Sequence, residues 1–250
     1  MSAFFPNIWH DIKAAAGILT RIPVQLDDAA LARRKGQFFW AFPLIGLAVG
    51  GIGAGIGMLA LAVFPATLAA LFSVLVIALI TGALHEDGLA DCADGFWGGH
   101  TPQKRLAIMK DSHIGTYGAL ALVLGIGLRI AALGSLFASG GWVLVIAIIV
   151  FSRTAMLVIM YGLPNARGAG FAHTVGEPDQ NQLGIAIGLT ALLLLVSLPA
   201  SLAVLLAAAT GCALVAWLAH KKIGGYTGDV LGATQQVTEI FGLLAAVALL

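Results

Sequence analysis

The chain has 250 residues, of which 60% are hydrophobic and only 10% charged, and its net charge is +1. Soluble domains carry about 25% charged residues, so this composition excludes a soluble globular protein and predicts an all-α, polytopic bundle of membrane helices in a single domain. A net charge near zero gives no electrostatic basis for a nucleic-acid partner. The two cysteines, Cys92 and Cys212, lack the spacing of a disulfide framework or a zinc site.

Residues 1–37 are predicted to form a cytoplasmic N-terminal segment without a cleavable signal peptide, because charges appear early, at Asp11 and Lys13. Within it, residues 4–20 carry apolar side chains at helical spacing, which predicts an amphipathic helix. This helix either lies in the membrane interface, with Trp9 at headgroup depth, or docks on the protein's own loops.

Apolar runs predict about seven membrane spans, with six as the alternative count. The spans cover residues 39–64, 66–84, 117–138, 141–161, two halves of 184–219, and about 241–250, with an earlier start of the last span as the alternative. Residues 184–219 are too long for one crossing at about 1.5 Å per residue, so we break them at 197–201. Glycines four residues apart in the first span, such as Gly46 and Gly50, indicate close packing within the chain or in a homo-oligomer.

Positive charge gathers on one side of the predicted membrane. The N-terminal segment and the polar segments 85–116, 162–183 and 220–239 hold every Lys and Arg except Arg129 and Arg153. The positive-inside rule places this side in the cytoplasm, which predicts a bacterial inner-membrane protein with its active site facing the cytoplasm. A secondary transporter, one alternative, would more typically place its ionisable groups near the midplane, where only the two arginines are expected.

The densest polar feature is a group of acids directly after the second predicted span. Asp87, Asp91 and Asp94 stand at i, i+4 and i+7, which puts three carboxylates on one face of a helix. Their repulsion favours a bound divalent cation, and hard oxygen ligands suit Mg²⁺ or Mn²⁺. His85 beside them is expected to orient a ligand or accept a proton. The alternative is a solvated acidic face and an interfacial histidine.

Two further polar stretches complete the predicted chemistry. Lys110, Asp111 and Ser112 precede the third span, where they contribute to a site or simply cap the helix. Asp229, close to Thr227 in a glycine-rich stretch, belongs either to the same site or to an interhelical loop. Carboxylates with scattered cations on one membrane face predict metal-assisted transfer of a phosphoryl-containing group, with the cations holding the phosphates.

These stretches together resemble the cobalamin synthase (adenosylcobinamide-GDP ribazoletransferase) family. The matching sequences are His85-x-Asp87-Gly-Leu-Ala-Asp91-x-x-Asp94-Gly, Met109-Lys-Asp-Ser-x-Ile-Gly-Thr116, Gly224-Gly-x-Thr-Gly-Asp-x-Leu-Gly232 and Phe42-Pro-Leu-Ile-Gly46. They spread over most of the chain, and the three polar motifs in this order are specific where any one alone is not. Glu86 falls at a variable position of the family pattern, which leaves its role open.

The resemblance implies a defined reaction. The adenosylcobinamide-phosphate moiety of adenosylcobinamide-GDP passes to α-ribazole or its 5′-phosphate, which gives adenosylcobalamin or its phosphate and GMP, and Mg²⁺ is required. It implies catalytic roles for His85, Asp87, Asp91 and Asp94, of which the three aspartates hold the metal. For substrate binding we expect Arg105, Lys110, Asp111, His113, Arg129, Arg153, Thr227 and Asp229.

One alternative enzyme class would also use acidic residues and a divalent metal for phosphoryl transfer. CDP-alcohol phosphotransferases of phospholipid synthesis carry a longer acidic pattern in which D-G-x-x-A is followed by Arg. Here Ala90 is followed by Asp91, and the later pair of acids in that pattern is missing. The sequence therefore favours the corrinoid-dependent reaction, with membrane lipid and a second copy of the chain in a homo-oligomer as the other expected partners.

Overall fold

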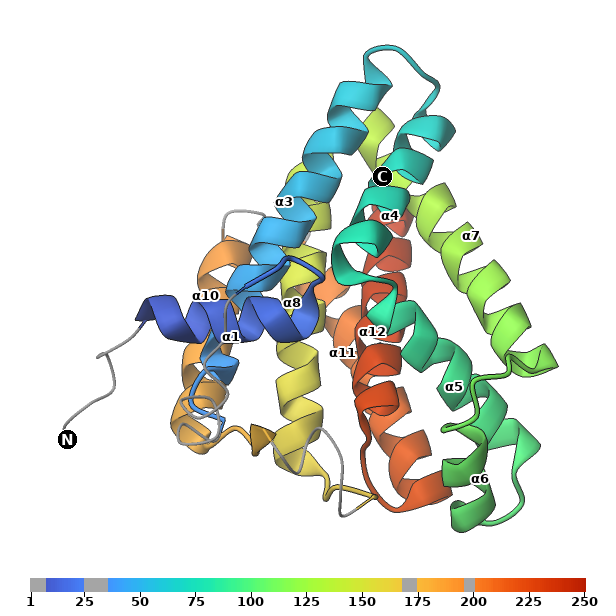
Figure 1. Ribbon diagram of the computed structural model, residues 1–250. Helices are drawn as coiled ribbons and strands as arrows, with labels where there is room; N and C mark the ends of the chain where they lie inside the picture. The colour runs from blue at the N-terminus through green and yellow to red at the C-terminus, as the bar shows by residue number, and fades with distance from the viewer. Residues whose placement is uncertain (1–7, 25–35, 168–174, 196–200) are drawn as a thin grey trace.

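The computed structural model describes residues 8–24, 36–167, 175–195 and 201–250 (Figure 1). Within these ranges the chain forms helices and no β-strand, apart from one isolated bridge between Asn165 and Tyr226. The predicted all-α class is confirmed.

Apolar helices make up most of the bundle. They are α3 (Phe42–Leu61), α4 (Ala66–Thr81), α7 (Thr116–Ala138), α8 (Trp142–Gly162), α10 (Gln180–Leu195), α11 (Ser201–Ile223) and α12 (Gly228–Ala248). Five described helices are long and apolar enough to cross a membrane. Helices α4 and α5 (Leu84–Gly98), which meet at a bend of 89°, add a sixth if the pair is counted as one span. The polytopic bundle is confirmed, and the predicted count of about seven is reached only when the 16-residue α10 is included.

The uncharged turns and the charged connections lie at opposite ends of the bundle. The α3–α4 turn forms one end, and the short helix α6 (Pro102–Ile108) lies at the other (Figure 1). Helix α3 packs closely on α8. The absence of a side chain at Gly46 permits this, since a Cβ there would lie 3.1 Å from the Cα of Val150. Gly51 and Gly55 face open space instead. The predicted glycine packing thus applies to one face of α3.

The N-terminal helix α1 (Ile8–Leu19) lies across α3 and α8 (Figure 1). It contacts α3 and the 3-10 turn η1 (Phe39–Ala41). The buried carboxylate of Asp11 accepts a hydrogen bond from the Trp40 indole at 3.1 Å. Trp9 remains 68% exposed on the other side. An amphipathic helix is therefore confirmed over residues 8–19, docked on the protein, whereas residues 4–7 lie outside the described part.

Helix α12 corrects one predicted boundary. The last span was expected to begin near residue 241, but α12 begins at Gly228 and most of its polar side chains are buried. Gln235, Gln236 and Glu239 find hydrogen-bond partners on neighbouring helices, so their polarity does not keep this stretch out of the bundle. The predicted break at 197–201 falls almost wholly outside the described residues, with α10 and α11 on either side of it.

Candidate active site

A sharp bend sets the direction of the acidic helix α5. Gly82 ends α4 with φ +64° and Ala83 follows with φ +54°, so two successive residues adopt the left-handed conformation. For alanine this conformation costs on the order of 1 kcal/mol. The bend of 89° turns α5 away from the axis of α4. Asp87 then lies in the first turn of α5, where the helix dipole favours negative charge.

Two glycines bring α5 against the start of α12. A Cβ at Gly88 would lie 2.6 Å from the backbone oxygen of Asp229, and a Cβ at Gly232 would lie 3.2 Å from the Cα of Gly88. Any side chain at either position would separate the helices. Their contact puts Asp229 beside the acids of α5, so that Asp87 and Asp229 line one cavity. The first and third sequence motifs therefore converge at this crossing.

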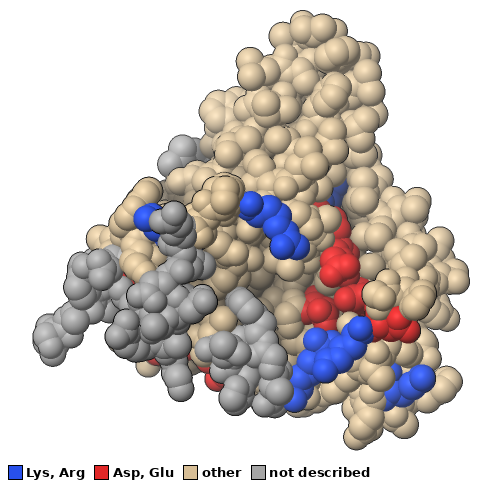
Figure 2. Space-filling view, viewed as in Figure 1, with Lys and Arg blue, Asp and Glu red and all other residues tan. Residues whose placement is uncertain are grey.

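The charged residues on this side of the molecule form one group. Figure 2 shows acidic and basic side chains together over the middle and lower part of the visible face, whereas its apex carries no charge. The Arg167 guanidinium donates to Asp229 at 2.8 Å, with both side chains about one-fifth exposed. Sequence reasoning gave Arg167 no role. The one indication in the sequence was that Arg167 lies in a polar segment predicted to face the same side of the membrane as Asp229.

Asp94 has a different position from the other acids of α5. Its carboxylate accepts hydrogen bonds from the backbone N–H groups of Gly115 at 2.7 Å and Gly118 at 2.9 Å. Both glycines leave room for the carboxylate, because a Cβ on either would clash with it. Asp94 thus caps the N-terminus of α7, while each of its oxygens retains a lone pair. It joins the first motif to the end of the second.

The donor atoms at this crossing fit a hard divalent cation. Carboxylates of Asp87, Asp91 and Asp229 could supply oxygen ligands, and among the described residues only Arg167 offsets their charge by a direct ion pair. Among the described residues, no three acidic, histidine or cysteine side chains already converge as a metal site. A metal would therefore require side-chain rotation at Asp87, which is exposed, and at Asp91, which is half-buried.

The second motif faces the acids across a cavity of about 360 Å³. Asp87 and Asp91 line it on one side, and the loop after α6 lines it on the other with Lys110, Asp111 and His113. The His113 ring lies 2.6 Å from the Asp111 carboxylate. This hydrogen bond raises the pKa of the His113 imidazole and lowers the pKa of the Asp111 carboxyl. The structure therefore brings the Lys110 ammonium and the hydrogen-bonded Asp111–His113 pair to the acidic face.

Two other predicted substrate ligands have partners within the protein. The Arg105 guanidinium donates to the backbone oxygens of Gly99 and Lys222, which ties α6 to the end of α11. The Thr227 hydroxyl accepts from the Val230 N–H and caps α12, and it also bonds to Asp229 at 3.2 Å. Their contact with substrate stays a prediction.

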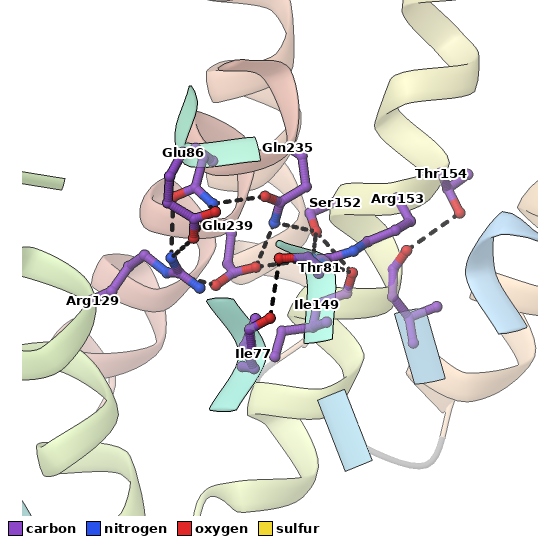
Figure 3. A network of polar contacts seen from close by, with 12 residues as sticks. Ile77, Thr81, Glu86, Arg129, Ile149, Ser152, Arg153, Thr154, Gln235 and Glu239 are labelled. Carbon is purple, nitrogen blue, oxygen red and sulfur yellow. Dashed lines mark hydrogen bonds and ion pairs between the residues drawn. The ribbon is translucent and has the colours of Figure 1, made fainter. Parts of the chain in front are cut away.

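The two intramembrane arginines occupy a buried network (Figure 3). Arg129 bonds to Glu86 at 2.7 Å and to Glu239 at 2.9 Å, and Arg153 bonds to Glu239 at 3.1 Å. Glu86, whose role the motif left open, is thus an ion-pair partner that joins α5 to α7. Substrate contact by Arg129 and Arg153 stays a prediction. Glu239 had not been assigned, because the sequence does not show which distant residues will pair.

Amides extend the same network. Gln235 reaches the Ser152 hydroxyl at 3.1 Å and also bonds to Glu239, and Gln236 donates to Glu86 at 3.0 Å. Because all these side chains are buried, each bond counters a desolvation cost. The network fixes α5, α7, α8 and α12 relative to one another, and it includes Glu86, which directly precedes Asp87 in the chain.

Comparison with known proteins gives a consistent result over nearly the whole chain. A family described as cobalamin-5-phosphate synthase matches residues 11–247. An adenosylcobinamide-GDP ribazoletransferase of a Sinorhizobium species is 42% identical, with 98% of both chains covered. Proteins of the same name from Rhizobium meliloti and Bradyrhizobium diazoefficiens are each 40% identical, over 97% of this chain and 97% and 95% of their own. No solved structure matches at a significant level.

Proposed function

Because the chain belongs to the cobalamin-5-phosphate synthase family, we propose that it acts as an adenosylcobinamide-GDP ribazoletransferase in the assembly of cobalamin. The observation that carries this proposal is the convergence of the three family motifs on one site. Asp87 and Asp91 of the first motif and Lys110 of the second line one cavity, and Asp229 of the third joins Asp87 in the other.

The reaction is an in-line displacement at phosphorus. A ribose hydroxyl of α-ribazole, or of its 5′-phosphate, attacks the phosphorus on the cobinamide side of the diphosphate. The new P–O bond joins ribazole to cobinamide phosphate, and the bond to the bridging oxygen breaks, so that GMP leaves. The hydroxyl proton passes to a carboxylate of the acidic face or to His85.

The residues of the site divide this work among them. Lys110 lines the polar cavity, where its ammonium can hold phosphate oxygens of the diphosphate. Asp87 lines both cavities, so its carboxylate can reach groups bound in either of them. Asp87, Asp91 and Asp94, with Asp229 as a further ligand, would hold Mg²⁺, and the chemistry it would supply is neutralisation of negative charge on the phosphoryl group.

A substrate panel tests the proposed activity. Purified protein in lipid vesicles, given adenosylcobinamide-GDP and α-ribazole, is expected to release GMP in equal amount to the adenosylcobalamin formed. GMP release should require the ribazole. Release of CMP from a CDP-alcohol, without turnover of adenosylcobinamide-GDP, would instead identify a phospholipid-type phosphotransferase.

We further propose that the acidic face lies on the cytoplasmic side of a bacterial inner membrane, because the sequence segments predicted on that side hold every Lys and Arg except Arg129 and Arg153. Cysteine labelling from outside intact cells tests this orientation. We expect Ser139→Cys, in the exposed α7–α8 turn, to react with a membrane-impermeant maleimide, and His100→Cys to react only after permeabilisation. The native Cys92 and Cys212 are buried, so background should be low. The opposite pattern would reverse the orientation.

A further inference from the structure

Two cavities of different character meet at Asp87. The polar one is the cavity of about 360 Å³ beside Lys110. The other, of about 310 Å³, has His85, Asp87 and Asp229 among its lining residues. The rest of its lining is largely apolar and includes Leu19, Phe39, Phe42, Met156, Met160 and Leu231. An apolar cavity with a few polar groups is the usual form of a site for a small aromatic molecule.

We propose that this apolar cavity binds the benzimidazole base of the ribazole nucleophile and so presents its ribose to the acids. The inference rests on the proposed function and assigns one substrate to one cavity. Phosphate groups then belong to the polar cavity, where Lys110 lies. Asp87, shared by both, stands where the ribose hydroxyl must meet the phosphorus.

The chemistry of the two substrates decides which group enters the apolar cavity. A corrin macrocycle is too large for about 310 Å³. Guanine carries several donors and acceptors, and each would cost roughly 2–7 kcal/mol if buried unpaired among these side chains. A dimethylated benzimidazole has two ring nitrogens, and one of them is bonded to ribose. Only that base can enter the cavity with a single polar atom left to satisfy.

His85 supplies a partner for that atom. Its side chain is 1% exposed and lines the cavity, and its Nε2 has no hydrogen-bond partner in the described part of the chain. An Nε2–H donor would bond to the free ring nitrogen of the base, which leaves the hydroxyl proton to a carboxylate. Phe39 and Phe42, whose rings lie 5.3 Å apart edge to face, provide an aromatic wall.

Filling the cavity tests the assignment. Met160 is 2% exposed and lines the cavity, so Met160→Trp should occupy the space of the base. We expect the KM for α-ribazole to rise at least about tenfold, while the KM for adenosylcobinamide-GDP stays unchanged. Val158→Trp is the matched control, because Val158 lies on the same helix but is 43% exposed. It should leave both constants as in the wild type.

Met160→Ala enlarges the cavity instead of filling it. This second variant tests the assignment of the base to the cavity even if Met160→Trp does not fold. The enlarged cavity should shift the ratio of kcat/KM towards a ribazole analogue with a naphthimidazole base by about tenfold. An unchanged KM for α-ribazole in Met160→Trp, or an unchanged base preference in Met160→Ala, would overturn the assignment. Failure of the wild-type protein to turn over adenosylcobinamide-GDP would overturn the proposed function instead, so the two failures are distinguishable.

Discussion

Replacing Asp91 by Asn is expected to lower the rate of GMP release by roughly 10²–10³-fold, the range for removal of one electrostatic group from a site where charge develops. Asn keeps the shape of the side chain and removes its charge. Asp91 lines the polar cavity opposite Lys110, and it is half-buried, so the substitution should leave the protein folded and inserted. Initial rates with saturating substrates measure the loss of catalysis. The yield of detergent-solubilised protein and its melting temperature show separately whether the variant is folded.

Matched variants sharpen this result. Asp179→Asn is the control, because Asp179 is an exposed acid that caps α10 by accepting from the Gln182 N–H, and Asn caps as well as Asp. It should keep normal activity and stability.

Asp94→Asn should lose activity and also about 1–2 kcal/mol of stability, because its amide cannot accept both N–H bonds from Gly115 and Gly118. Near-normal activity of Asp91→Asn would remove the acidic face from the mechanism.

Replacing Arg129 by Met is expected to destabilise the protein by about 3–5 kcal/mol, the typical cost of removing one partner from a buried ion pair. The substitution leaves Glu86 and Glu239 buried without the guanidinium between them. Arg153 remains to pair with Glu239, so Glu86 bears most of the loss. Unfolding in a denaturant series at constant detergent measures the change.

A second substitution should restore much of that stability. Glu86→Gln removes the uncompensated charge and keeps an oxygen that accepts from Gln236. The double variant of Arg129→Met and Glu86→Gln is therefore expected to be more stable than Arg129→Met alone. Equal stability of the two would show that the ion pair does not couple these helices. The activity of the double variant also tests the predicted contact between Arg129 and substrate. If the guanidinium binds substrate, activity should stay low even where stability is restored.

The sequence predicted what depends on local composition. Charge-free runs located most of the spans, and the spacing of Asp87 and Asp91 placed both acids on one face of α5. What depends on distant partners was not predictable. Helix α12 begins 13 residues before the predicted boundary at 241, because Gln235 and Glu239 are satisfied by α7 and α8 rather than by water. For the same reason the sequence did not indicate that Arg167 pairs with Asp229.

The family motifs explain why the sequence nonetheless indicated which stretches line the same cavities. Each motif supplies acids or cations within a short stretch, and a common membrane face was predicted from the distribution of charge. The close approach of α5 and α12 at Gly88 and Gly232 was not predicted, since a glycine pair has meaning only once its neighbour across the helix interface is known. That contact sets the position of Asp229 beside the acids.

The metal dependence of GMP release tests the central proposal most directly. We propose that the acids at the α5–α12 crossing act through a bound divalent cation. Vesicle-embedded protein stripped with EDTA should release no GMP from adenosylcobinamide-GDP and α-ribazole, and added Mg²⁺ should restore release along a saturable curve. Asp229→Asn should shift this curve to higher Mg²⁺ concentration. Full activity after EDTA treatment, or an Mg²⁺ curve unchanged in both Asp91→Asn and Asp229→Asn, would contradict the proposal.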